Sequence, residues 1–120
     1  MSITSPISVV IGGTTWLLNK INNDAYGSEY FGSGADSEVT MKIRHTREKA
    51  LADGTSYDRH NVEIRETVYP TDTSPQLERH CYVVLRNKRN DDKTAVVDTW
   101  EGLVDFLTDA HLADLAAWVN

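Results

Sequence analysis

The sequence predicts an α+β fold in which a run of antiparallel strands is followed by two helices. Apolar and polar residues alternate over residues 38–44, 59–68 and 79–87, which is typical of strands with one buried face. From about Thr94 to Val119, apolar residues instead recur at intervals of three and four, the spacing of one helical face. Because the strands come first and the helices last, we expect the helices on one side of an antiparallel sheet.

The chain of 120 residues is long enough for one domain, 1–120, with one hydrophobic core. Its hydrophobic content of 40% and charged content of 25% are globular values. We find neither a stretch of about 18 apolar residues, which a membrane span needs, nor a basic segment followed by an apolar one at the N-terminus. We therefore expect a soluble protein without a signal peptide or a membrane partner.

The first part of the chain predicts a hairpin followed by a loop. Two β-rich runs, residues 7–11 and 14–18, flank the pair Gly12-Gly13, which is a strong signal for a two-residue turn. Residues 22–37 are rich in Gly, Ser, Asn and Asp, so we expect a loop there, with one short strand near residues 29–31.

The three alternating segments predict strands with an inward and an outward set of side chains. A charged turn, residues 46–57, separates the first two segments, and a proline-bracketed loop separates the last two. The inward set is Val39, Met41, Ile43, Val62, Ile64, Cys81, Val83 and Leu85. The outward set is Thr40, Lys42, Arg44, Asn61, Glu63, Arg65, His80, Tyr82, Val84 and Arg86.

The helical segment has an unusually wide apolar side. Its first part carries Val96, Val97, Trp100, Leu103, Val104 and Leu107, which together with Phe106 span an arc of roughly 180°. A helix that only covers a sheet needs an apolar stripe a little over about 100° wide, so the excess suggests a second surface such as a partner subunit. Asp91, Asp92 and Thr94 are candidate N-caps. Thr108 and Asp109 resemble a second helix start, which predicts two short helices joined by a bend.

The charge distribution qualifies what the net charge implies. A net charge of −6 argues against a general nucleic-acid binder. However, residues 38–93 hold eleven of the twelve Lys and Arg, whereas residues 94–120 hold five acids and no Lys or Arg. The sheet could therefore offer a locally basic face while the helices present an acidic one.

The sequence contains no catalytic or metal-binding motif, so we expect neither an enzyme nor a bound cofactor or metal. It lacks the nucleotide-binding glycine motifs, the nucleophile elbow and the zinc-binding helix motif. The four histidines show no metal-ligand spacing. Cys81 is the only cysteine, so its simplest interpretation is a buried thiol and the alternative is a disulfide between subunits.

The outward set of the sheet carries the side chains that RNA binding needs. Lys and Arg neutralise phosphates, Thr and Asn hydrogen-bond to bases, and Tyr stacks on an unpaired base. The candidate RNA-binding residues are Thr40, Lys42, Arg44, Asn61, Arg65, Tyr82 and Arg86. The alternative is a solvated face without a ligand.

Taken together, the order of these elements resembles the coat proteins of single-stranded RNA bacteriophages, the levivirus-like phages. The likeness covers the N-terminal hairpin, the glycine-rich passage, the strands 39–44 and 59–65, the strand that contains Tyr82, and the two terminal helices. It implies a hairpin followed by a five-stranded sheet, and helices that interlock in a dimer. It also implies an icosahedral capsid, assembled in the bacterial cytoplasm, whose inner sheet face binds an RNA hairpin that serves as packaging signal and translational operator.

The resemblance assigns roles to single residues. Thr40 and Lys42 match the family's adenine-pocket and phosphate positions, with Arg44 beside them. Asn61 matches a polar pocket position, and Tyr82 matches the tyrosine that stacks on a loop base.

Two positions depart from the family pattern, because Glu63 replaces a lysine of well-known members and Val84 replaces an asparagine. The resemblance therefore supports the fold more strongly than a particular operator. Interlocked helices would bury apolar side chains between subunits, and the candidate dimer interface comprises Trp100, Leu103, Val104, Leu107, Leu112 and Leu115. The alternative function is a small dimeric RNA-binding repressor or binding module that builds no shell.

Overall fold

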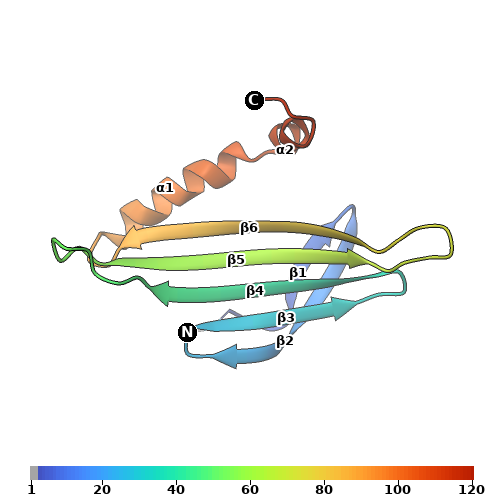
Figure 1. Cartoon of the computed structure of the whole chain (residues 1–120), viewed down its shortest axis with the longest axis horizontal. Coiled ribbons are helices and arrows are strands. Elements are labelled where there is room, and N and C mark those ends of the chain that lie inside the picture. Colours follow the sequence, from blue (N-terminus) through green and yellow to red (C-terminus); the bar gives the residue numbers. More distant parts are fainter. Residues whose placement is uncertain (1–2) are drawn as a thin grey trace.

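In the computed structural model, which describes residues 3–120, six antiparallel strands form one curled sheet and two helices follow it (Figure 1). Each strand pairs with its neighbours in the chain, so the order across the sheet is β1 to β6. The strands are β1 (Ile7–Ile11), β2 (Thr14–Asp24), β3 (Gly27–Ser33), β4 (Ser37–Arg47), β5 (Tyr57–Val68) and β6 (Leu77–Lys88). The helices are α1 (Lys93–Phe106) and α2 (Asp109–Ala116). The predicted α+β class is confirmed.

The predicted separation of a hairpin from a five-stranded sheet is wrong in detail, because β2 belongs to both. Its first half pairs with β1, from Thr14 to Leu18, and its second half pairs with β3. The register shifts between Lys20 and Asn22, which marks a bulge. Since a bulge bends its strand, the hairpin turns away from the plane of the sheet and lies behind it in Figure 1.

The hydrophobic core lies between this hairpin and one face of the sheet, which we call the core face. Its buried members are Leu18, Tyr30, Val39 and Ile43. The apolar side chains packed around them are Ile7, Val9, Ile11, Trp16, Met41, Val62 and Ile64. Val62 lies directly opposite Ile43 and Ile64 opposite Met41, so the predicted inward alternation of these strands is confirmed.

The glycine-rich passage is a full strand rather than the predicted loop with a short strand. β3 pairs along its whole length with β4. A Cβ on Gly27 would overlap the carbonyl oxygen of Ile43, and one on Gly32 would lie 2.7 Å from Cδ2 of Leu18. Glycine at these positions therefore permits the close approach of neighbouring chain segments. The composition of the passage resembles that of a loop, although the passage forms a strand.

The two helices begin where the sequence predicted, with a bend between them. The side chain of Asp92 accepts a hydrogen bond from the backbone N–H of Thr94 at 3.1 Å, which caps α1. The hydroxyl of Thr108 accepts one from the N–H of His111 at 3.3 Å and caps α2. The chain thus starts a new helix at Thr108 instead of continuing α1.

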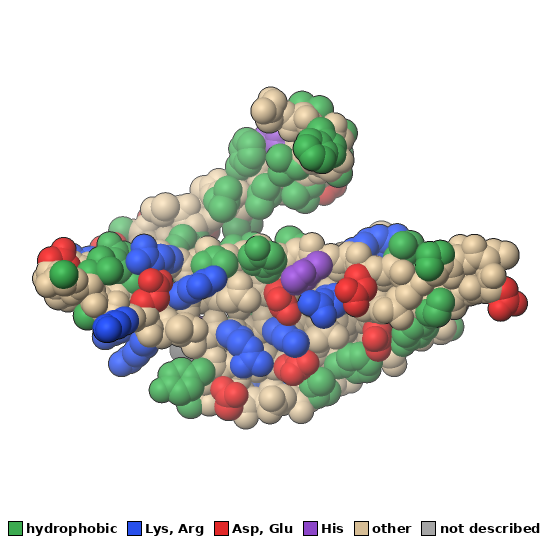
Figure 2. All heavy atoms as spheres, viewed as in Figure 1, with side chains coloured by type: hydrophobic (Ala, Val, Ile, Leu, Met, Phe, Trp, Pro, Cys, Tyr) green, Lys and Arg blue, Asp and Glu red, His purple; other side chains and the backbone are tan. Residues whose placement is uncertain are grey.

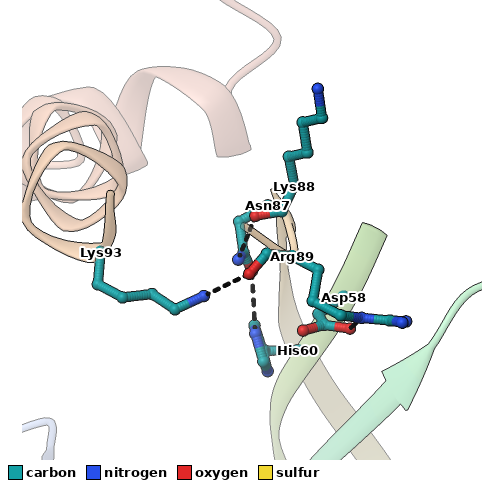
Figure 3. A network of polar contacts seen from close by, with 6 residues as sticks. All are labelled: Asp58, His60, Asn87, Lys88, Arg89 and Lys93. Atoms are coloured by element: carbon teal, nitrogen blue, oxygen red, sulfur yellow. Dashed lines mark hydrogen bonds and ion pairs between the residues drawn. The ribbon is translucent and has the colours of Figure 1, made fainter. Parts of the chain in front are cut away.

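A polar network and one apolar contact hold the start of α1 against the sheet (Figure 3). His60 Nε2 lies 3.1 Å from Oδ1 of the buried Asn87, whose amide donates to the carbonyl of Lys88. The ammonium of Lys93 donates to the carbonyl of Arg89 at 3.3 Å. Beside this network, Val96 of α1 is buried. The rings of Trp100 and His60 make an edge-to-face contact.

Beyond this anchor, the helices leave the sheet. In Figure 1 both lie past β6, and α2 stands clear of the strands. β6 is an edge strand, paired only with β5 within the part of the chain described. Cys81 on β6 is therefore exposed in the single chain. The prediction of a buried thiol is wrong for the single chain, because neither helix covers Cys81.

Candidate nucleic-acid and subunit interfaces

The sheet face opposite the core carries polar side chains from three neighbouring strands, and we call it the open face. The register places Thr40, Arg65 and His80 side by side across β4, β5 and β6. All seven predicted RNA-binding residues share this face, namely Thr40, Lys42, Arg44, Asn61, Arg65, Tyr82 and Arg86. Figure 2 shows Lys and Arg side chains gathered over the sheet on the side turned to the viewer. The alternation therefore predicted correctly which side chains lie together.

The cations of the open face differ in how far they are neutralised by their neighbours. Arg44 and Arg65 have no carboxylate within 4.0 Å among residues 3–120. Lys42 lies 3.9 Å from a carboxylate oxygen of Glu29, at the outer limit of an ion pair. The Nε of Arg65 is buried and finds no hydrogen-bond partner in the described chain. Among the predicted RNA-binding residues, Arg44 and Arg65 are thus the cations without a carboxylate neighbour in the described part of the chain.

Arg86 is held more firmly than its sequence position indicated. Its guanidinium donates two hydrogen bonds to Glu48, at 2.7 and 3.1 Å, and lies 3.9 Å from the ring centroid of Tyr57. These bonds from Arg86 lower the pKa of Glu48 and raise that of Arg86. Glu48 and Tyr57 were missed as members of this surface, because both fell within the predicted turn from Thr46 to Tyr57. In the structure Glu48 directly follows β4 and Tyr57 is the first residue of β5.

An aromatic pair stands at the edge of the open face. Tyr82 is 62% exposed, and its ring centroid lies 5.6 Å from that of His80 at a tilt of 40°. His80 Nε2 lies 3.1 Å from a carboxylate oxygen of Glu63. Tyr82 is therefore available to stack on an unpaired base, whereas Glu63 places a carboxylate on the same face.

The predicted subunit interface is strongly apolar and largely uncovered in the single chain. Trp118, at 95% exposure, adds to this surface beyond the predicted set. Trp100 and Leu107 are half-buried within the chain, since Trp100 packs on His60. The exposed predicted members are Leu103, Val104, Leu112 and Leu115. Hydrophobic side chains cover much of the visible helical surface in Figure 2.

Other kinds of site receive no support from the geometry. Among residues 3–120, no three His, Cys, Asp or Glu side chains gather as they would around a metal ion. In the same residues, neither helix is long and apolar enough to cross a membrane. The surfaces that remain are a polar sheet face with cations and an apolar pair of helices beyond an edge strand.

Comparison with known families identifies this arrangement. The sequence model described as phage phiCb5, coat protein, matches residues 4–88, which is well over half of the chain. The chain belongs to the phage phiCb5 coat-protein family. The resemblance to the levivirus-like coat proteins is thereby confirmed, and the protein is a structural component of the virion capsid rather than an enzyme. A search of curated proteins gave no match.

The match to the phiCb5 coat-protein family covers all six strands but neither helix. The family assignment therefore rests on the sheet, including every predicted RNA-binding residue.

Proposed function

We propose that this coat protein forms a dimer through its helices and the edge of β6, and that dimers build an icosahedral shell around RNA bound to the open face. The observation that carries the proposal is the division of the chain into two surfaces. One is an apolar helical surface that no other part of residues 3–120 covers, and the other is a polar face whose cations are only partly neutralised.

Dimer formation would remove two unfavourable features of the single chain, an exposed apolar surface and an open strand edge. Exposed Leu103, Val104 and Leu115 leave apolar area in water, and monomeric proteins rarely carry such a contiguous patch. No strand of the described residues pairs with the outer edge of β6, and pairing with a second β6 would close that edge. In such a dimer the helices of one subunit would lie over the sheet of the other.

RNA binding follows from the chemistry of the open face. Arg44 and Arg65 supply charge to phosphates, Thr40 and Asn61 supply hydrogen bonds, and Tyr82 supplies an exposed ring. A hairpin with unpaired loop bases suits this surface, because its bases can stack and pair with side chains while its phosphates meet the cations.

Assembly can be tested by negative-stain microscopy and light scattering of the purified protein. Uniform hollow particles built from dimers are expected. Stable dimers that never form particles would favour the alternative, a small dimeric RNA-binding repressor or binding module. A stable monomer would contradict both forms of the proposal.

RNA binding can be tested by filter binding of RNA recovered from particles, over a series of salt concentrations. Lys42→Ala should weaken binding and flatten the salt dependence by about one counterion per lost contact. Arg47→Ala is a matched control, because Arg47 lies on the same strand but on the core-face side. Equal effects of the two variants on RNA binding would show that the RNA does not bind on the open face.

The role of the aromatic ring can be separated from that of its hydroxyl. Tyr82→Ala should cost about 1–3 kcal/mol of RNA binding if the ring stacks on a base, whereas Tyr82→Phe should keep most of it. Because Tyr82 is exposed, neither change should disturb the fold, which circular dichroism can verify. Unchanged affinity of Tyr82→Ala would exclude stacking at this position.

A further inference from the structure

His80 lies among the groups of the open face and is the one side chain there whose charge ordinarily changes between about pH 5 and 8. Its Nε2 lies 3.1 Å from Oε2 of Glu63. Since a carboxylate can only accept, the neutral imidazole must carry its hydrogen on Nε2. A second proton would then enter at Nδ1, which makes a new donor and a positive charge without breaking the bond to Glu63.

The charges around His80 are closely balanced while its ring is neutral. Glu63 lies directly between Lys42 and Tyr82 across the sheet, and Arg65 lies directly opposite His80. Lys42 also meets Glu29 of β3, so these two acids and two bases cancel. Protonation of His80 therefore adds one positive charge beside these four balanced groups.

Further charged groups face the same end of the sheet. Thr40, Arg65 and His80 form one row across the sheet. In the next row on the same face, Glu38 of β4 and Glu78 of β6 lie on either side of Thr67 of β5. These carboxylates make this end of the open face unfavourable for phosphate when His80 is neutral.

We propose that His80 is a proton-dependent RNA-binding residue of the open face, which attracts an RNA phosphate beside the stacking ring of Tyr82 only when protonated. This inference rests on the proposed RNA-binding function. The geometry supports it because the ring centroids of His80 and Tyr82 are 5.6 Å apart, so that a nucleotide stacked on Tyr82 has its phosphate within reach of His80.

The proposal sets the size and sign of the pH effect. RNA binding should strengthen as the pH falls, because protonated His80 adds one cation to the site. By linkage, one proton taken up on binding changes the dissociation constant by at most about tenfold per pH unit. The salt dependence should steepen as well, by close to one counterion for one added phosphate contact.

The experiment measures filter binding of labelled RNA recovered from particles, at about pH 8 and about pH 6, for the wild type, His80→Gln and His80→Lys. Gln can still donate to Glu63 but does not titrate, so His80→Gln should bind with the weak affinity of the wild type at high pH. Lys stays charged, so His80→Lys should bind tightly at both pH values. The other histidines remain in every variant, so the difference between variants isolates His80.

Glu63→Gln and Glu66→Gln form a matched pair of controls. Both carboxylates belong to β5 and both pair with a β6 side chain, but Glu66 pairs with Arg79 on the other face. Glu63→Gln should tighten RNA binding several-fold at about pH 8 by removing a charge that repels phosphate, and Glu66→Gln should not.

Two outcomes would overturn the proposal while leaving RNA binding itself intact. One is a His80→Gln variant that keeps the full pH dependence of the wild type. The other is a His80→Lys variant that binds no more tightly than the wild type at high pH. If RNA fails to bind any of the proteins at low salt, the proposed function and this inference both fall.

Discussion

Replacing Leu115 by Asp tests most directly whether the exposed helical surface is a subunit interface. Leu115 is 55% exposed in the single chain, so about half of its apolar area remains to be buried. Full burial of a leucine contributes about 1.5–3 kcal/mol, so association would gain roughly 1 kcal/mol or more from each copy. The aspartate would forfeit this gain and also place a carboxylate against apolar groups.

The combined cost in a symmetric dimer is large. Burying an unpaired carboxylate costs several kcal/mol, and the two copies together should lose about 5 kcal/mol or more. Such a loss weakens dimer formation by more than about a thousandfold. Because α2 stands clear of the strands, the subunit's own core should be affected little.

Light scattering and microscopy measure the outcome, with Ala110→Asp as the matched control. Ala110 lies on the same helix but on the side away from the Leu112 and Leu115 stripe, and its position near the N-terminus of α2 suits an added acid. We expect Ala110→Asp to assemble like the wild type and Leu115→Asp to fail. Normal dimers and particles from Leu115→Asp would refute the helical interface.

Three further variants test the stability of the subunit. Gly27→Ala should destabilise by about 1–3 kcal/mol, because its Cβ overlaps the backbone carbonyl of Ile43 and backbone cannot easily move. Gly102→Ala in α1 meets nothing within 4 Å in the chain and should instead stabilise the helix by up to about 1 kcal/mol, so urea unfolding that ranks the two variants the other way would contradict this account. Hydrogen bonding from Arg86 lowers the pKa of Glu48, so the pair stabilises the fold above the ordinary glutamate pKa and loses this effect as the pH falls through the lowered value. Thermal unfolding of the wild type and Glu48→Gln should differ at neutral pH and converge in acid, and a constant difference across the titration would be inconsistent with this pair.

The strands and helices with clear periodicity could be predicted because periodicity is a local property. Val39, Met41 and Ile43 face the core simply because side chains alternate along a strand, and the same rule placed Lys42 on the open face. The cap at Thr108 was predictable for a similar reason, since it depends on a side chain three residues from the amide it binds.

Features that depend on distant parts of the chain could not be obtained in this way. Gly27 and Gly32 resemble loop residues in sequence, and only the close approach of β4 and β2 shows why glycine is needed within a strand. Likewise Arg86 meets Glu48 across 38 positions of sequence, so its partial neutralisation follows from the register of the sheet and not from its own strand.

The sequence by itself determined the α+β class, the membership of the open face and the width of the apolar helical arc. Only the tertiary structure decided that β2 joins hairpin and sheet, that β6 is a free edge and that the helices project beyond it. The physical reason is that side-chain periodicity records which face of an element is apolar, whereas what covers that face depends on contacts between elements distant in the chain.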